Sequence, residues 1–467
     1  MKYLLLHSDA GKSIARALRD KFVTDLRPPT ADNLEEALLD AAFEVYPALL
    51  LPPDPHMTDL PFGENLSSLV SVVTYRKSLP FIEAVKNSGD LSRIFTEVDP
   101  HIGPSVTYRS NTGMGGTLQL WMLPDSVIRG AWQECGDSYP SVSRFSEMTL
   151  ERFRRTREVL TGKKGRAAAK IAFAGALLPS DAPLKFGDGV VRPVTAAERK
   201  NAPQSLRGKV SGQVGDADPV TVNYDGDILL EYGFPYKIQL GVSLDDPSSR
   251  SPDMLPPNDI DRTALRLRFA LMLAVERTPR AQLMQTWSAF AGPIFDQLSI
   301  SWSDPRQGPG FMPVQLTSAD VESWIKWFGC LSARRVDRIE LALSRILRAV
   351  AERRDMSDVL IDSVIAWENL FGTKEGEPTF RVTMCLAKLL KDSFEDRKAF
   401  KARLGKIYSL RSKIVHGSGN PKLDEHLLCQ QALDVAIDAI RILVSERTDI
   451  LDIPDGALRS SALLLDQ

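Results

Sequence analysis

The stretch YSLRSKIVHGSGN, residues 408–420, holds the residues whose types and spacing could do chemistry. Arg411 and His416 lie five positions apart, in a chain that has only five histidines. Arginine is a permanent cation that binds phosphate or carboxylate, whereas histidine exchanges protons near neutral pH. This pair of residue types is therefore suited to transfer a proton and to stabilise the negative charge of a phosphate.

Both side chains are expected on one helix, over residues 395–416, but on different faces of it. At about 100° per residue, Arg411 lies with Leu404 in an apolar stripe, whereas His416 lies with Ser412 on a polar flank. A buried guanidinium costs several kcal/mol unless an acidic group pairs with it. The pattern therefore predicts an acidic partner for Arg411.

The helix expected over residues 357–371 offers that partner. Glu368 falls at the edge of the apolar stripe of this helix, so we predict a direct contact between Arg411 and Glu368. His416 would occupy the last turn of its own helix, where the helix dipole favours its protonated form, if Gly417 ends the helix. Spacing alone also allows a purely structural ion pair and a histidine that only terminates a helix.

The elements around these residues are helical from residue 262 onward. The hydrophobic period and the loop lengths predict helices over residues 262–277, 280–299, 318–331, 336–354, 357–371, 379–391, 395–416 and 421–446. Local start and stop signals support several boundaries: Ser393 with Asp396 as a capping pair, Asn420 before Pro421 at a helix start, and Gly372 and Gly417 after helix ends.

The preceding chain is of mixed and then strand-like character. The pattern over residues 1–160 predicts a mixed α/β region, which is a candidate sensor. The pattern over residues 161–258 predicts a β-rich region that ends in a linker over 245–259. Asp225 and Gly226 predict a tight hairpin turn between two strands. The expected fold class is thus α+β multidomain: a helical connector over 259–335 and an all-α bundle over 336–447 follow the β-rich part, with a tail over 448–467.

Composition excludes several classes of protein. A formal net charge of -2 over 467 residues excludes binding of nucleic acid through overall basicity. Four scattered cysteines, with no paired spacing, predict neither a disulfide scaffold nor a zinc site, and no cofactor motif is complete. Apolar runs are too short for a membrane span or a signal-peptide core. We therefore expect a cytoplasmic protein without metal, cofactor or membrane contact.

The helical part resembles the Apea-like branch of the HEPN ribonucleases. Arg411 to His416, RSKIVH, matches the R-x4-H motif of that family, and the surrounding runs ERR, LID, WENLFG and LRSKIVHG follow in the order that the resemblance requires. The match covers residues 337–447, roughly a quarter of the chain. The resemblance implies a helical bundle that forms a homodimer, in which two such motifs face each other and cut RNA without a metal ion.

The resemblance also implies roles for individual residues. Arg411 and His416 would be the catalytic pair, Ser412 the polar position after the arginine, and Glu368 the acidic residue of the preceding helix. RNA supplies its own nucleophile, the 2′-hydroxyl, so such a site needs only a proton shuttle and a cation on the phosphate. Lys413 lies in the motif and is a candidate for RNA binding.

A second basic stretch lies earlier, in ERFRRTREVLTGKKGRAAAK, residues 151–170. It could contact RNA through its cations, or it could be a solvated helix face between two regions. The candidate RNA-binding residues here are Arg154, Arg155, Arg157, Lys163 and Lys164.

We thus expect a metal-independent endoribonuclease whose N-terminal part senses a trigger. The resemblance implies bacterial anti-phage defence by abortive infection, a phage-derived trigger, and RNA with unpaired loops such as tRNA as the substrate. The alternative is a HEPN bundle that only dimerises, or that binds nucleotide or RNA, within a regulatory or scaffolding protein.

Overall fold

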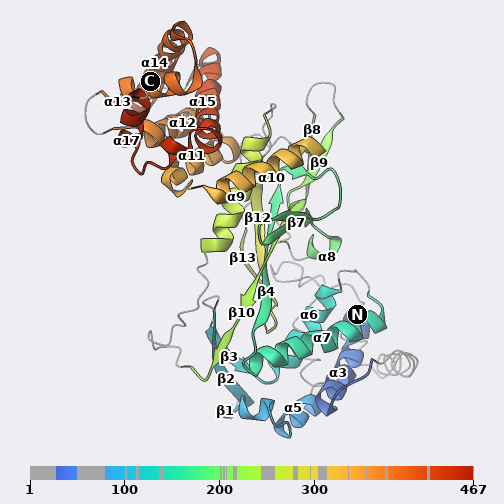
Figure 1. The fold of residues 1–467 in the computed structure, drawn as a ribbon. Helices are drawn as coiled ribbons and strands as arrows, with labels where there is room; N and C mark the ends of the chain where they lie inside the picture. Colours follow the sequence, from blue (N-terminus) through green and yellow to red (C-terminus); the bar gives the residue numbers. More distant parts are fainter. Residues whose placement is uncertain are drawn as a thin grey trace.

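The computed structural model describes residues 28–49, 79–99, 103–111, 115–135, 140–199, 202, 206, 208–213, 218–242, 258–276, 282–294, 296–302, 313–334, 336–353, 355–373, 377–417 and 421–465. The linker predicted over 245–259 lies almost entirely outside these residues. The described part is elongated, with the N-terminal elements at one end and the C-terminal helices at the other (Figure 1). It is α+β, as the sequence predicts.

The N-terminal part packs helices on a small antiparallel sheet. Its helices are α3 (Asn33–Leu49), α5 (Leu79–Lys86), α6 (Met122–Glu134) and α7 (Val142–Leu160). Its strands are β1 (Glu97–Asp99), β2 (Gly103–Ser110) and β3 (Gly115–Gln119), and a later strand, β11 (Ile238–Leu240), pairs with β2. The aromatic rings of Phe81, Phe145 and Phe153 are fully buried among these elements, so the region has a core of its own.

A six-stranded antiparallel sheet connects the two ends of the molecule, in the order β13-β12-β4-β10-β7-β6. The strands are β4 (Gly165–Ala174), β6 (Leu184–Phe186), β7 (Gly189–Pro193), β10 (Ile228–Tyr236), β12 (Met284–Ala291) and β13 (Asp296–Trp302). Both β4 and β10 are long: Ala167 and Phe234 lie in the N-terminal core, whereas Phe173 and Ile228 lie in the C-terminal one. The boundary predicted at residue 160 therefore does not separate two independent cores.

Short elements complete the middle of the chain. They are β5 (Ala176–Leu177), α8 (Ala196–Arg199), β8 (Lys209–Gly212), β9 (Val220–Asn223) and β14 (Val314–Gln315). The pair formed by β5 and β14 is parallel, and β8 pairs with β9 in an antiparallel manner.

The helix predicted over 280–299 is wrong, because β12 and β13 occupy these positions. The strand β12 lies inside its sheet, between β13 and β4, and a β-bulge between Gln285 and Ser288 interrupts its register with β4. Within this bulge Thr286 and Trp287 are both buried, and both side chains donate to the carbonyl of Asp225. Continuous burial removes the alternation that would have indicated a strand. Gly292 and Pro293, which separate the two strands, were the signal against a continuous helix.

The turn at Asp225 and Gly226 exists, but the hairpin predicted around it does not. Gly226 adopts a φ of 96°, as a tight turn requires. The strands on its two sides belong to different sheets, because β9 pairs with β8 whereas β10 pairs with β4 and β7. Arg199 holds the turn through Asp225 at 2.6 Å and Asp227 at 2.7 Å, so buried ion pairs replace the hairpin ladder.

The C-terminal helices lie where the sequence predicts them. They are α10 (Ser318–Ala333), α11 (Glu340–Ala351), α12 (Met356–Phe371), α13 (Pro378–Leu390), α14 (Phe394–Val415) and α15 (His426–Ser445). The start predicted at Asn420 and Pro421 is wrong: Asn420 lies outside the described residues, Pro421 is not helical, and α15 begins after the short 3-10 turn Leu423–Glu425.

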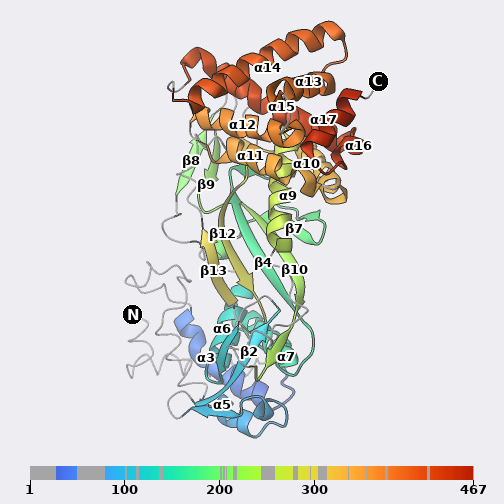
Figure 2. The ribbon, with the colours of Figure 1, turned by 90° about the vertical axis from the view of Figure 1, so that its left-hand side faces the viewer.

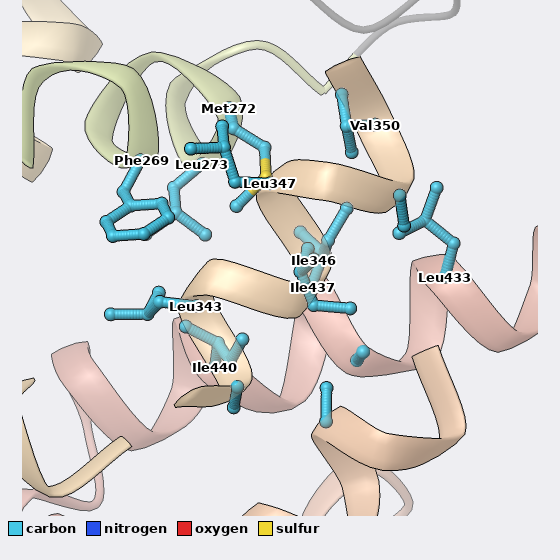
Figure 3. Packing of buried hydrophobic residues seen from close by; sticks show 14 of the residues in the cluster. Phe269, Met272, Leu273, Leu343, Ile346, Leu347, Val350, Leu433, Ile437 and Ile440 are labelled. Carbon is cyan, nitrogen blue, oxygen red and sulfur yellow. The ribbon is translucent and has the colours of Figure 1, made fainter. Parts of the chain in front are cut away.

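Helix α9 (Asn258–Ala274) attaches this bundle to the sheet (Figure 2). The indole of Trp324 in α10 donates a hydrogen bond to the carbonyl of Leu267 at 2.9 Å, and Arg441 in α15 donates one to the carbonyl of Leu273 at 3.0 Å. Figure 3 shows the apolar contacts between α9, α11 and α15, made by Phe269, Met272, Leu273, Leu343, Ile346, Leu347, Val350, Leu433, Ile437 and Ile440. The predicted helical connector is thus two helices that flank strands of the main sheet.

The segment predicted as a tail, 448–467, is part of the bundle. It forms α16 (Thr448–Leu451) and α17 (Gly456–Leu465). The guanidinium of Arg459 is 1% exposed and donates to the carbonyls of Asn369 at 2.7 Å, Leu370 at 2.8 Å and Ile453 at 2.8 Å. Arg459 therefore satisfies carbonyls at the end of α12 that no helical partner can satisfy.

Within the described ranges, no helix combines the length and the apolar character that crossing a membrane requires.

Candidate active site

Helix α14 carries the Arg411 and His416 pair and has well-defined ends. Ser393 accepts a hydrogen bond from the backbone N–H of Asp396 at 3.1 Å, which confirms the predicted start. At the other end the backbone N–H of His416 donates to the carbonyl of Ser412 at 3.1 Å, and Gly417 follows with a φ of 81°. Gly417 is therefore the predicted glycine after the helix, and His416 is the last residue before the chain turns.

Gly372, which the sequence places after α12 in the same role, differs. Its φ is -70°, so it does not adopt the left-handed conformation. A Cβ at this position would lie 2.3 Å from the carbonyl oxygen of Glu368. Glycine is needed here for a close backbone approach rather than for a positive φ.

Arg411 is half-buried and has an unused donor. Its Nε atom is buried without a hydrogen-bond partner, and no ion pair within 4.0 Å joins the guanidinium to a carboxylate of the described residues. The direct contact predicted between Arg411 and Glu368 is therefore wrong. Because the side chain is only half-buried, the end of the guanidinium can reach water, and its charge does not need a carboxylate in contact.

Tyr408 lies one turn before Arg411 and, like it, has a buried polar atom that is not hydrogen-bonded within the described ranges. Its ring packs against that of Trp367 in α12, with 5.8 Å between the ring centroids, and its side chain is 9% exposed. Its hydroxyl group is buried and has no hydrogen-bond partner within the part of the chain that the structure describes. An unsatisfied buried hydroxyl is costly, so a group that accepts a hydrogen bond here would relieve the structure.

Glu368 interacts with these two residues through its charge. Burial raises the pKa of the Glu368 carboxyl above its ordinary value, and the positive charge of Arg411 opposes that rise. The pKa of Tyr408 is also raised, chiefly by burial and further by the Glu368 charge, while Arg411 again acts in the opposite direction. The three side chains thus form one electrostatic group, without a direct ion pair between Arg411 and Glu368.

The buried carboxylate of α12 that is tightly paired is Asp362. It is 1% exposed and accepts hydrogen bonds from Arg345 at 2.8 Å and from Arg353 at 2.6 Å. Arg353 and Asp362 belong to the ERR and LID runs on which the family resemblance partly rests. These two runs therefore hold α11 and the loop after it against α12, which is a structural role.

His416, Ser412 and Lys413 are exposed at the same end of α14. No side-chain hydrogen bond engages the imidazole of His416 among the described residues. An exposed imidazole can exchange protons with solvent and with a bound substrate. The predicted polar flank is confirmed, and it lies beside the half-buried cation of Arg411.

Large exposed apolar side chains lie close to this end of the helix along the chain. Val415 is 49% exposed, Leu427 in α15 is 65% exposed, and Leu423 between them in the chain is 85% exposed. These three residues follow or precede His416 closely in the sequence. Such exposure beside a polar site indicates a surface suited to contact another protein.

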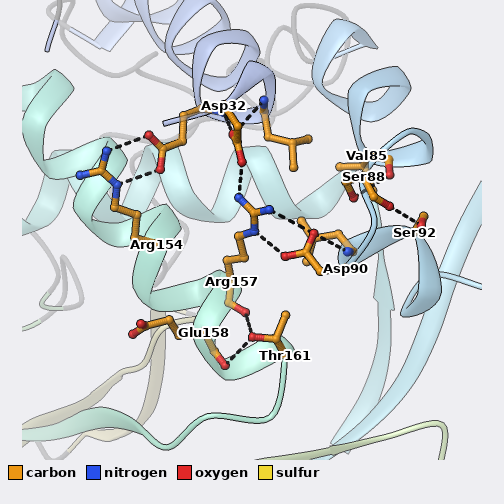
Figure 4. A network of polar contacts seen from close by, with 12 residues as sticks. Asp32, Val85, Ser88, Asp90, Ser92, Arg154, Arg157, Glu158 and Thr161 are labelled. Atoms are coloured by element: carbon orange, nitrogen blue, oxygen red, sulfur yellow. Dashed lines mark hydrogen bonds and ion pairs between the residues drawn. The ribbon is translucent and has the colours of Figure 1, made fainter. Parts of the chain in front are cut away.

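The basic run of α7, predicted as a candidate RNA contact, is largely engaged by acidic side chains (Figure 4). Arg154 forms two hydrogen bonds to Glu35 at 2.7 and 2.8 Å, and Arg157 binds Asp90 at 2.6 Å. These contacts hold the pKa values of Glu35 and Asp90 below their usual range. Arginines committed in this way are poor candidates for RNA contact.

Two of the other candidate cations in this run are also paired with acidic side chains. Arg155 pairs with Glu134, and Lys163 forms an exposed pair with Glu158 at 3.1 Å. Lys164 is exposed in the turn before β4. The arginines of α7 therefore fasten this helix to its neighbours, and the structure does not gather them with Arg411 and His416, which lie at the opposite end of the molecule (Figure 1).

No protein-family model, no curated protein and no solved structure matches this chain. The geometry around α14 is therefore the basis for a proposal about function.

Proposed function

We propose that this chain is a metal-independent endoribonuclease of the HEPN type, with its active site at the end of α14. The observation that carries the proposal is that an arginine with an unused donor and an exposed histidine lie on one helix. The buried Nε donor of Arg411 has no partner in the described ranges, and His416 is exposed at the tip of the same helix. A phosphate oxygen would satisfy the guanidinium, and the imidazole would transfer protons beside it.

The reaction follows from these groups. His416 removes the proton of the RNA 2′-hydroxyl, the 2′-oxygen attacks the adjacent phosphorus, and the bond to the 5′-oxygen of the next nucleotide breaks. That oxygen takes a proton from a second imidazole, and His416 of a second copy of the chain is our candidate. Arg411 stabilises the charge that develops on the phosphate. The products are a 2′,3′-cyclic phosphate and a 5′-hydroxyl.

Tyr408 and Glu368 support the same chemistry from behind Arg411. The buried hydroxyl of Tyr408 has no partner in the described part of the chain, so it would donate to a phosphate oxygen once bound RNA displaces the side chains that cover it. Glu368 acts on Arg411 through its charge rather than through a hydrogen bond. Ser412 and Lys413, both exposed on the same turn, are positioned to contact the RNA backbone.

Dimerisation would complete the site. The exposed Val415, Leu423 and Leu427 offer an apolar surface next to His416, so a second copy could cover them and bring its own His416 to the same cleft. This surface also favours the second candidate function, a bundle that dimerises within a scaffolding or regulatory protein and does not cut RNA.

The substrate class and biological setting follow from the resemblance in the sequence. RNA with unpaired, splayed nucleotides, such as the loops of tRNA, suits a small cleft. Bacterial anti-phage defence by abortive infection, with a phage-derived trigger acting on the N-terminal part, is the setting that we propose.

The test is to incubate the wild type, Arg411→Ala and His416→Ala with total RNA in the presence of EDTA, and to map the new ends. We expect cleavage by the wild type only, with cyclic phosphate and 5′-hydroxyl ends. Lys406→Ala, a change at an exposed position of the same helix, is the control and should cut like the wild type. Identical RNA profiles from all four proteins would defeat the nuclease proposal and leave the scaffolding function.

A further inference from the structure

A groove opens between the start of α13 and the middle of α14, apart from the candidate active site. It has a volume of about 780 Å³, and its lining includes Phe380, Thr383, Lys398, Lys401 and Gly405. This volume lies in the range of small-molecule and nucleotide sites, roughly 300–1,000 Å³. The two helices are antiparallel neighbours joined by a short connection, and α14 extends past the first residue of α13, so the groove lies beside the part of α14 that leads to Arg411.

The chemistry of the groove is cationic and aromatic. Lys401 places its ammonium group 4.2 Å from the centre of the Phe380 ring, and the Phe380 side chain is nevertheless 47% exposed. Neither Lys398 nor Lys401 forms an ion pair with a carboxylate of the described residues. Glu377 is the acidic side chain of the lining, at the edge where α13 begins. Two ammonium groups beside an exposed ring are typical of surfaces that bind single-stranded nucleic acid.

The groove is aligned with the candidate catalytic residue. At about 100° per residue, Lys398, Lys401, Gly405, Ser412 and His416 all fall within roughly 60° of one another on one stripe of α14. Gly405 and His416 are separated by about 16 Å along the helix axis, from a rise of 1.5 Å per residue. An extended strand that enters the groove can therefore follow the same helix face to His416 within a few nucleotides.

We propose that this groove binds the single-stranded RNA that flanks the cut, with a base against Phe380 and phosphates on Lys398 and Lys401. The inference rests on the proposed ribonuclease function and deepens it, because it names where the substrate is held outside the cleavage site. Glu377 can accept hydrogen bonds from the amino group of a base. The exposed Phe380 ring decides between the candidate occupants: an acidic peptide would also meet the lysines, but its carboxylates would gain nothing from the ring.

Gly405 provides a substitution that fills the groove without disturbing the fold. A Cβ added at Gly405 would meet no atom within 4 Å, and the residue lies inside a helix. Leucine is a better helix former than glycine, so Gly405→Leu should leave the chain at least as stable. Gly329 in α10 has the same open surroundings and lies outside the groove, so Gly329→Leu is the matched control.

The experiment measures binding of a fluorescent 2′-O-methyl RNA oligonucleotide to the full chain by anisotropy at low salt. This probe lacks the free 2′-hydroxyl and is not cut. We expect Gly405→Leu, Phe380→Ala and Lys401→Gln each to raise Kd by about fivefold or more, since a stacked base or a phosphate contact contributes on that scale. Lys401→Gln should also reduce the salt dependence of log Kd by about 0.7, the loss of one phosphate contact.

The controls are Gly329→Leu, Phe394→Ala, which removes another exposed ring of α14, and Lys406→Gln. They should bind like the wild type. Unchanged binding by the three groove variants would overturn the inference, as would displacement of the RNA by poly-glutamate with equal affinity.

The outcome is separable from that of the proposed function. If the wild type cuts RNA in EDTA and the groove variants bind and cut equally well, only the proposal about the groove is overturned. If binding depends on the groove but the wild type cuts no RNA, only the proposed ribonuclease function is overturned.

Discussion

Replacing Tyr408 by phenylalanine should make the protein more stable and less active. The hydroxyl of Tyr408 is buried and has no partner among the residues that the structure describes, whereas the ring itself packs against Trp367. An unsatisfied buried hydroxyl costs about 1–3 kcal/mol, and Tyr408→Phe removes that cost while it keeps the ring contact. We therefore expect a gain of about 1 kcal/mol or more in the free energy of opening of α14.

Hydrogen exchange of peptides from α14 is the assay, because the whole chain has more than one core and a single unfolding transition is not assured. A gain of about 1.4 kcal/mol slows exchange roughly tenfold. Tyr46→Phe is the control: its hydroxyl donates to the carbonyl of Pro140 at 2.7 Å, so that variant should lose stability.

The same Tyr408 variant should cut RNA more slowly. A hydrogen bond from the hydroxyl to a charged phosphate contributes about 1.5–3 kcal/mol, so its loss lowers the cleavage rate by roughly 10- to 150-fold. Faster exchange in Tyr408→Phe, like that in Tyr46→Phe, would show that the hydroxyl has a partner in the folded protein. Faster cleavage would show that it has no part in binding the phosphate. Either result would refute the reasoning.

Three further results are expected. The raised pKa of Glu368 means that the folded state holds this proton more tightly than the unfolded chain does. In denaturant titrations, the wild type should therefore lose stability relative to Glu368→Gln as pH rises above 4.5, the ordinary pKa of a glutamate. A loss of stability as pH falls would instead indicate a direct ion pair with Arg411. Arg459→Met should remove three hydrogen bonds and destabilise the end of α12 by about 3 kcal/mol, with exchange there roughly a hundredfold faster, whereas exposed Arg403→Met should not. Leu427→Glu should convert a dimer to a monomer in sedimentation; an unchanged mass would place the dimer contact elsewhere.

The helices around the candidate site could be predicted because local chemistry defines them. Ser393 and Gly417 mark the ends of α14, and the apolar stripe that contains Leu404 and Tyr408 is the face that the structure buries. A period of 3.6 residues and a capping side chain act within a few residues, so they are visible without knowledge of the rest of the chain.

The contacts of Arg411 could not be predicted in the same way. The helix wheel shows that the side chain lies in the apolar stripe, but the distance to Glu368 depends on how α12 and α14 pack, and the sequence does not fix that. The buried carboxylate that is paired is Asp362, on another face of α12. The sequence pattern places Tyr408 in the same apolar stripe, but it does not reveal that the hydroxyl of Tyr408 lacks a partner among the described residues.

The remaining misses share a cause, which is contact between residues far apart in the chain. The interior position of β12 hides its alternation, and Arg459 reaches the end of α12 from what the sequence indicates is a tail. The cations of the basic run in α7 meet acids from α3 and from the segment after α5, among them Glu35 and Asp90. A run of like charges in a sequence therefore does not reveal whether its charges remain available.

The most direct test of the central claim is the rate at which the wild type and His416→Ala cut one mapped RNA site in EDTA. The account predicts a loss of about a hundredfold or more in His416→Ala, the usual contribution of a general acid or base, and no comparable loss in His426→Ala at the start of α15. Equal rates for the wild type and His416→Ala would contradict it.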